Sequence, residues 1–123
     1  MRMKDIVFKE ARIINRGKMI EGDIWVRGDR IERIDPSISL QQQYTEVPVN
    51  GRYLIPGIID DQVHFREPGL EYKATIFSES RAAVAGGVTS FMEMPNTRPP
   101  AVTQELLEEK YKIAARTSWA NYS

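Results

Sequence analysis

The sequence predicts an α/β protein in which a β-rich N-terminal part precedes alternating strands and helices. Up to about residue 55, apolar and polar residues alternate in short runs separated by turn signals, a pattern typical of β-strands. After that point, short apolar runs alternate with segments of helical periodicity in the order β-α-β-α-(β). Such alternation predicts parallel strands joined by right-handed crossovers. We therefore expect two parts, residues 1–55 and residues 56–123.

The N-terminal part is expected to consist of short strands and tight turns. Gly28-Asp29 stands between two alternating runs and predicts a hairpin, because glycine accepts the positive φ that tight turns require. Residues 37–45 are polar and predict an exposed loop. A further strand is expected over residues 46–49, before a turn at Asn50-Gly51.

The C-terminal part is expected to hold a strand over residues 58–65, a helix over 75–85, a strand over 88–94, a helix over 103–116 and the beginning of a strand over 119–123. Gly86-Gly87 would end the first helix. Thr103 is the expected N-cap of the second, with Glu105 in its first turn, where the helix dipole favours negative charge. Val102 and Leu107 have the spacing of a hydrophobic staple.

These elements correspond to the beginning of a larger fold. Two βα units cannot close a barrel, and a (β/α)₈ barrel takes roughly 250 residues. The expectation is therefore the first two βα units and the beginning of strand 3 of a TIM barrel, with the other strands beyond this chain. In the chain alone, Ile58, Ile59, Val88 and Phe91 would face water, and such unpaired edges favour aggregation.

Composition excludes several classes of function. Seventeen Lys and Arg residues balance seventeen Asp and Glu residues, which argues against nucleic acid and anionic membranes as partners, since both need clustered basic charge. No apolar run resembles a signal peptide or approaches the ~20 residues of a membrane span, so a cytoplasmic location is expected. Cysteine is absent, and His64 is the single histidine. Any metal site must therefore also draw on carboxylates, amide oxygens or residues outside this chain.

The most informative segment for chemistry is residues 60–69. Successive strand residues point to opposite faces, so Gln62, His64 and Arg66 are expected to share one side at the carboxyl end of their strand, where barrel enzymes build their sites. An imidazole, an amide oxygen and a guanidinium converging there could hold a metal ion and an anionic substrate. Asp60 is expected to support the strand end by hydrogen bonding.

A second polar segment, Met94-Pro95-Asn96-Thr97, follows the strand over 88–94, so the two loops could face one pocket. Asn96 offers amide donors to a carboxylate or a carbonyl, although it could also be a turn residue next to proline. Two roles remain open for Glu93: it could support the site from behind, or it could pair with a basic side chain.

The residues of the first segment have plainer roles as well. His64 could be a structural or solvated histidine, and Gln62 could be a hydrogen-bonding residue beside the site. Arg66 could form a surface ion pair with Glu67 or Glu71.

Four motifs, in this order, resemble the dihydroorotases of the amidohydrolase superfamily. They are Pro56-Gly57-Ile58-Ile59-Asp60, Val63-His64-Phe65-Arg66-Glu67-Pro68-Gly69, Arg81-Ala82-Ala83 with Ala85-Gly86-Gly87-Val88-Thr89, and Met94-Pro95-Asn96-Thr97. The resemblance runs from about Asp5 to the last residue. Hydantoinases and allantoinases share the fold, but they usually lack the features at Arg66 and in the last motif.

The resemblance implies a (β/α)₈ barrel with a small β-sandwich built from both chain ends, of which residues 1–55 would be the N-terminal share. It implies reversible hydrolysis of the ring amide of dihydroorotate to N-carbamoyl-aspartate in pyrimidine biosynthesis, by a metal-bound hydroxide. Zinc is the implied cofactor, as one or two ions. The other ligands and the catalytic aspartate are expected in later strands, so this chain alone is not expected to be active.

The resemblance also assigns roles to single positions. His64 matches the second histidine of a His-x-His zinc motif, and Arg66 and Asn96 match residues that bind the substrate carboxylate, a task that suits the planar guanidinium. Gln62 departs from the pattern, because it stands where the motif has its first histidine and an amide oxygen is a weaker zinc ligand. This departure leaves open a site with one zinc ion or a protein that has lost hydrolysis.

Three functions therefore remain. The first is a zinc-dependent dihydroorotase, favoured by Arg66 and Asn96. The second, favoured by Gln62, is an inactive dihydroorotase-like scaffold, as some relatives are beside aspartate carbamoyltransferase. The third is a cyclic amidohydrolase of the hydantoinase or allantoinase type. The expected partner is a small-molecule substrate, and the resemblance leaves open a homo-oligomer or an aspartate carbamoyltransferase partner.

Overall fold

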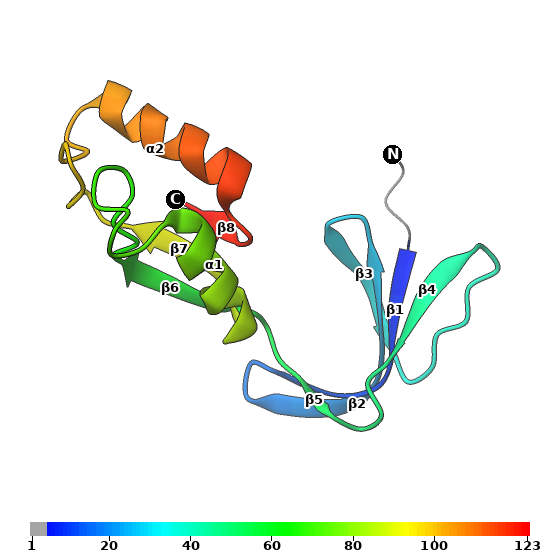
Figure 1. Cartoon of the computed structure of the whole chain (residues 1–123). Helices are drawn as coiled ribbons and strands as arrows, with labels where there is room; N and C mark the ends of the chain where they lie inside the picture. The colour runs from blue at the N-terminus through cyan, green and yellow to red at the C-terminus, as the bar shows by residue number, and fades with distance from the viewer. Residues whose placement is uncertain (1–4) are drawn as a thin grey trace. The chain divides into compact units, whose positions relative to one another are not determined.

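The computed structural model describes residues 5–123, and the chain divides into two compact units (Figure 1). One unit ends at Pro56 and the other spans Gly57–Ser123. Each has its own sheet and its own hydrophobic core. In the part of the chain that the structure describes, no helix is both long and apolar enough to cross a membrane. The chain is α/β, as predicted, and both helices of its described residues belong to the second unit.

The first unit contains a five-stranded sheet of β1 (Asp5–Asn15), β2 (Lys18–Arg27), β3 (Arg30–Asp35), β4 (Tyr44–Pro48) and β5 (Tyr53–Leu54). The order is β3-β2-β1-β4, and β5 also pairs with β1. β2 runs antiparallel to β1 and β3, whereas β4 and β5 run parallel to β1. The predicted hairpin at Gly28-Asp29 is confirmed, and so is the turn at Asn50-Gly51, where both residues have positive φ.

A buried carboxylate holds the irregular part of this sheet together. The register between β1 and β2 shifts between residues 8 and 11. Beside this shift, the Asp23 carboxylate accepts hydrogen bonds from the backbone N–H of Glu10 at 2.9 Å and of Ile38 at 2.8 Å, and it forms an ion pair with Lys9. Asp23 is only 2% exposed, so these donors replace the water that the carboxylate loses on folding.

The segment between β3 and β4 is less exposed than its polar composition predicts. Ile38 is fully buried in a cluster with Val7 and Trp25, and β4 begins already at Tyr44. The prediction of an exposed loop over residues 37–45 is therefore wrong at these two places. Ile38, with the partly buried Leu40 and Tyr44, anchors the segment to the core.

The second unit follows the predicted β-α-β-α-β order, with β6 (Ile58–Val63), α1 (Ile76–Ala85), β7 (Val88–Glu93), α2 (Gln104–Thr117) and β8 (Asn121–Tyr122). The three strands form a parallel sheet in the order β6-β7-β8. Thr75 and Thr103 cap the two helices through their side chains, the second as predicted. The predicted staple is not supported, because Val102 is 76% exposed.

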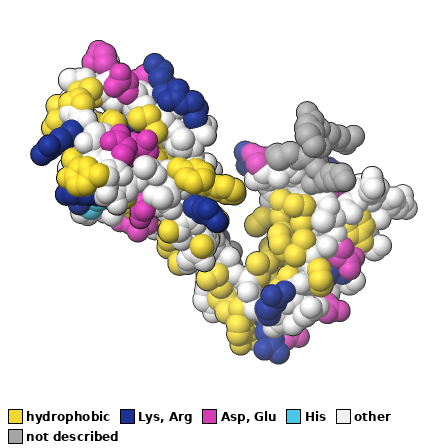
Figure 2. All heavy atoms as spheres, in the orientation of Figure 1, with side chains coloured by type: hydrophobic (Ala, Val, Ile, Leu, Met, Phe, Trp, Pro, Cys, Tyr) yellow, Lys and Arg dark blue, Asp and Glu magenta, His cyan; other side chains and the backbone are white. Residues whose placement is uncertain are grey.

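The core of the second unit lies between the sheet and its helices. Phe91, on the central strand, is only 2% exposed, and its ring centroid lies 4.6 Å from that of Phe65. Its predicted exposure is therefore wrong, because residues of both helices and of β8 pack around it. Ile58 and Ile59 are 50% and 65% exposed, as predicted, whereas Val88 is half-buried. Apolar side chains also reach the surface elsewhere on the second unit (Figure 2).

Candidate metal and substrate site

The carboxyl ends of β6 and β7 meet at one edge of the parallel sheet. The two strands are neighbours, with Val63 opposite Glu93, and the backbone N–H of Met94 donates to the Val63 carbonyl at 3.1 Å. Residues 64–69 and 94–100 therefore leave the sheet at the same edge, where ligand sites of parallel sheets are built. This edge is where the sequence predicts the candidate site.

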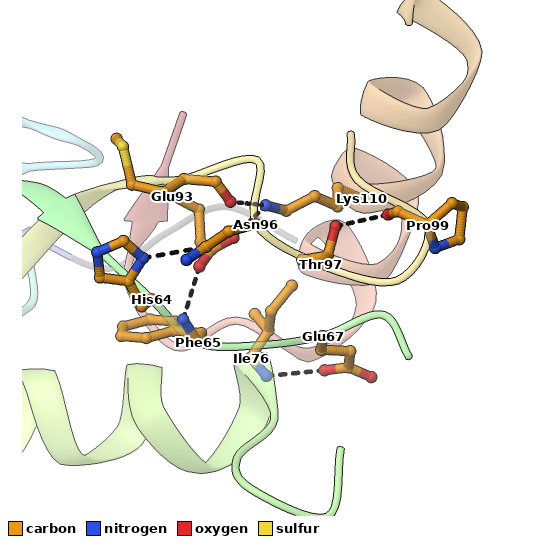
Figure 3. A network of polar contacts seen from close by, with 10 residues as sticks. His64, Phe65, Glu67, Ile76, Glu93, Asn96, Thr97, Pro99 and Lys110 are labelled. Carbon is orange, nitrogen blue, oxygen red and sulfur yellow. Dashed lines mark hydrogen bonds and ion pairs between the residues drawn. The ribbon is translucent and has the colours of Figure 1, made fainter. Parts of the chain in front are cut away.

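The structure brings His64 and Asn96 together from these two loops. Nδ1 of His64 lies 3.0 Å from Oδ1 of Asn96, and both residues are exposed (Figure 3). With the amide oxygen as acceptor, Nδ1 is the donor of this hydrogen bond. In that tautomer the lone pair of the imidazole lies on Nε2, where a metal ion could bind. The contact therefore favours the tautomer that a metal ligand needs.

Arg66 departs from the geometry that the sequence predicts. β6 ends at Val63, so the strand alternation that would place Arg66 on the side of Gln62 and His64 stops before it. The backbone of Arg66 instead has a φ of 71°, a left-handed conformation that costs a residue with a side chain about 1–2 kcal/mol. Such strain persists only where the surroundings impose it, and it is concentrated at binding sites.

The ion pair considered for Arg66 is not formed. Within residues 5–123 the guanidinium has no carboxylate within ion-pair distance. Glu67 instead accepts from the backbone N–H of Ile76 at 2.7 Å, and Glu71 accepts from that of Gly69 at 2.8 Å. The latter hydrogen bond lowers the pKa of the Glu71 carboxyl. Both carboxylates therefore shape the loop, and neither neutralises the arginine.

Gln62 is an exposed residue of β6, the strand that leads to His64. Asp60 supports this strand as predicted, since its Oδ1 accepts from the backbone N–H of Gln62 at 3.1 Å. Among the described residues, no hydrogen bond is formed by the side-chain amide of Gln62. The strand-supporting role of Asp60 is thus confirmed, whereas the metal-binding role of Gln62 stays a prediction.

The loops that follow β6 and β7 are in direct contact. The backbone N–H of Arg98 donates to the carbonyl of Pro68 at 3.0 Å. At Gly69, which has a φ of 86°, an added Cβ would lie 2.8 Å from the Arg98 carbonyl carbon and closer still to its oxygen. Thr97 is buried and donates from its hydroxyl to the carbonyl of Pro99 at 2.9 Å. Only glycine at position 69 allows the close approach to Arg98, which fixes one loop against the other.

Glu93 on β7 and Lys110 on α2 form a buried ion pair (Figure 3). Their side chains are only 6% and 7% exposed. The Glu93 carboxylate also accepts from the backbone N–H of Phe65 at 2.6 Å, and the Lys110 ammonium donates to the carbonyl of Met94 at 2.7 Å. Of the two roles left open for Glu93, pairing with a basic side chain is therefore observed.

Sequence reasoning missed Lys110, and it gave Thr97 no role beyond its place in the motif. Lys110 stands four residues after Leu106 and four before Ala114, on the stripe of α2 that faces the sheet, and a lysine in that stripe is a signal for a buried partner. Thr97 gives a weaker signal, because a threonine between prolines reads as an ordinary loop residue.

The donors at this edge of the sheet fit zinc only in part. Zinc sites in proteins use three or four ligands drawn from histidine, cysteine and carboxylates. Within residues 5–123, no group of three or more such side chains is placed to hold a metal ion. His64 offers one well-oriented imidazole nitrogen, so these residues can supply part of a metal site and cannot complete one.

Comparison with known proteins places this geometry in a family. Residues 51–123 match the family model described as dihydro-orotase-like. Among curated relatives, the chain is 39% identical over 103 residues to the dihydroorotase of Anoxybacillus flavithermus, covering 83% of this chain and 24% of the relative. It is 40% identical over 111 residues to the dihydroorotase of Halobacterium salinarum, covering 87% and 26%. This chain thus spans about a quarter of these relatives' length.

Solved structures of hydantoinases share the fold. The L-hydantoinase (dihydropyrimidinase) of Arthrobacter aurescens superimposes with a TM-score of 0.91 and 27% identity, covering 98% of this chain and 27% of that one. The D-hydantoinase of a Thermus species gives a TM-score of 0.81 and 27% identity, covering 96% and 26%. Because the family model matches more than half of the residues, this chain belongs to the dihydro-orotase-like family.

Proposed function

We propose that the full-length protein is a zinc-dependent dihydroorotase that reversibly hydrolyses the ring amide of dihydroorotate to N-carbamoyl-aspartate. The observation that carries the proposal is the contact between His64 and Asn96, which presents an imidazole nitrogen at the edge shared by two strand-end loops. In this proposal residues 1–55 belong to a small β-sandwich domain and residues 56–123 form the first βα units of a TIM barrel. The enzyme would act in the cytoplasm, in pyrimidine biosynthesis.

His64 would hold the metal through Nε2. Gln62, two residues earlier on β6, would be a weaker metal ligand beside it. A bound zinc ion supplies Lewis acidity, which polarises a carbonyl group and acidifies water. Asn96 would orient the imidazole of His64, because its hydrogen bond to Nδ1 favours one tautomer and one ring position in the absence of metal. The other ligands would come from the rest of the full-length protein.

Arg66 and Asn96 would bind the carboxylate of the substrate. The Arg66 guanidinium has no carboxylate partner within residues 5–123, so it can pair with an incoming anion. The Oδ1 atom of Asn96 is engaged by His64, which leaves the Nδ2 hydrogens to donate to the substrate. One amide would therefore contact both the metal ligand and the substrate.

Two other functions are supported by particular observations. The glutamine at position 62 favours an inactive scaffold, and the likeness to hydantoinases favours a related ring specificity. The test is to measure zinc content and turnover of the full-length protein with dihydroorotate, hydantoin and allantoin. Zinc near or above one equivalent with preferred turnover of dihydroorotate supports the proposal. Substoichiometric zinc without turnover favours the scaffold, and faster turnover of hydantoin or allantoin favours the third function.

Variants test the individual residues. We expect His64→Ala to lower zinc content and Gln62→His to raise it, since imidazole is the better zinc ligand. We expect Arg66→Ala to lower kcat/KM for dihydroorotate with little change in zinc content. Arg98→Ala is the matched control, because it removes an exposed positive charge from the other loop. Equal losses in both arginine variants would mean that general charge, and not a carboxylate contact at Arg66, attracts the substrate.

A further inference from the structure

We propose that the buried ion pair of Glu93 and Lys110 positions His64 for metal binding. This inference rests on the proposed role of His64 as a metal ligand. Neither side chain would touch the metal or the substrate, and both would act through the backbone on either side of the histidine.

The peptide groups that flank His64 are both fixed to the end of β7. On one side, the carbonyl of Val63 accepts from the backbone N–H of Met94 at 3.1 Å. On the other side, the backbone N–H of Phe65 donates to the Glu93 carboxylate at 2.6 Å. Phe65 lies beyond the end of β6 at Val63. Its N–H bonds the side chain of Glu93 in place of the backbone carbonyl that a longer parallel pairing of β6 and β7 would offer. His64 is thus held at the point where the chain leaves the sheet.

Lys110 fixes this carboxylate from α2. Its ammonium pairs with Glu93 and also donates to the carbonyl of Met94 at 2.7 Å (Figure 3). Met94 begins the loop that carries Asn96, the residue that hydrogen-bonds His64. The pair therefore fixes both partners of the His64–Asn96 hydrogen bond, one through the Phe65 amide and the other through the Met94 carbonyl.

A role in stability alone makes a different prediction. Replacing a buried ion pair by apolar side chains of similar volume is often neutral for stability, because the desolvation of both charges is avoided. The double substitution E93L/K110M should therefore keep the fold while removing the acceptor for the Phe65 N–H. By contrast, E93Q/K110M removes both charges and keeps an amide oxygen that can accept from Phe65.

The experiment measures the zinc affinity of the full-length protein by chelator competition, the visible spectrum of the cobalt-substituted protein and the melting temperature. We expect E93L/K110M to lose about 10–100-fold in zinc affinity, the usual effect of removing a group that orients a ligand, with an altered cobalt spectrum. E93Q/K110M should restore most of the affinity. The matched control is E108Q/K112M, which removes the exposed ion pair of the same helix and should change nothing.

Two results separate the outcomes. Unchanged zinc affinity and an unchanged cobalt spectrum in E93L/K110M, with a clear loss in His64→Ala, would overturn the positioning role and leave the proposed function standing. Unchanged zinc affinity in His64→Ala would overturn the ligand role itself. Should E93L/K110M fail to fold, E93D serves instead: it keeps the charge beside Lys110 but withdraws the carboxylate from the Phe65 N–H, so zinc affinity must fall in this variant as well.

Discussion

Replacing Gly69 with alanine is expected to push apart the two loops that carry the candidate site. The residue has a φ of 86°, and its Cβ would lie closer to the Arg98 carbonyl than real Cβ atoms come to any backbone atom. Because the obstacle is backbone, no side-chain rotation can relieve the contact. The loop after β6 must move away from the loop after β7, and the hydrogen bond from Arg98 N–H to the Pro68 carbonyl is lost.

The size of the effect follows from two costs and one smaller gain. The left-handed backbone costs alanine about 1–2 kcal/mol, and the lost hydrogen bond costs about 1 kcal/mol. Alanine returns about 0.5 kcal/mol by restricting the unfolded chain, so we expect Gly69→Ala to destabilise the unit by about 2 kcal/mol. Gly87→Ala is the matched control, since Gly87 has a φ of 91° and, among residues 5–123, no atom lies within 4 Å of an added Cβ.

The assay is amide hydrogen exchange, followed by mass spectrometry, of the peptide that contains Arg98 in the full-length protein. Protection of the Arg98 N–H should fall in Gly69→Ala and stay near wild type in Gly87→Ala, while the melting temperature falls further in the first variant. Equal protection and equal melting temperatures in the two variants would refute the reasoning, because the contact between the loops would then contribute nothing.

Three further predictions concern other parts of the chain. Asp23→Ala leaves the Lys9 ammonium and two backbone amides without their acceptor and should lower the free energy of unfolding by about 3 kcal/mol in urea titrations, whereas Asp29→Ala, in the exposed hairpin turn, should change it little. Burial raises the pKa of Asp23, but hydrogen bonds from Lys9 and two amides outweigh it and hold the pKa below 3.8. The stabilisation from these bonds is therefore present above pH 3.8 and lost as pH falls through the folded-state pKa. In acid titrations, the free energy of unfolding should fall more steeply with decreasing pH in wild type than in D23L/K9M. Arg66→Gly should relieve the strained backbone and raise the melting temperature slightly while lowering kcat/KM, and a lowered melting temperature would contradict the strain.

Local chemistry made much of the fold predictable. The N-cap at Thr103 and the turns at Gly28-Asp29 and Asn50-Gly51 depend on side chains that bond, or backbone angles that occur, within a few residues. The β-α-β-α-β order likewise follows from periodicity alone. The position of His64 and Asn96 at one edge of the sheet could be predicted because parallel neighbouring strands end on the same side.

The remaining features depend on contacts between distant residues. Lys110 is buried because Glu93 meets it from another element, and no local pattern identifies that partner. Ile38 is anchored by the cluster around Trp25, although its neighbours in the sequence are polar. Arg66 was expected to continue the strand alternation, but β6 ends three residues earlier and the backbone turns left-handed. A sequence pattern does not show where a strand ends, so the predicted alternation was extended beyond Val63. The candidate site begins at that strand end.

The backbone N–H of Phe65, next to His64, donates to the side chain of Glu93 and not to the backbone of a neighbouring strand. Sheet pairing constrains every following residue to the same straight path, whereas a single carboxylate constrains only one. The polypeptide is therefore free to change direction immediately after Phe65. Two residues further on, Glu67 already accepts from the backbone N–H of Ile76, the first residue of α1, so the loop after β6 is fastened to the helix and no longer to the sheet.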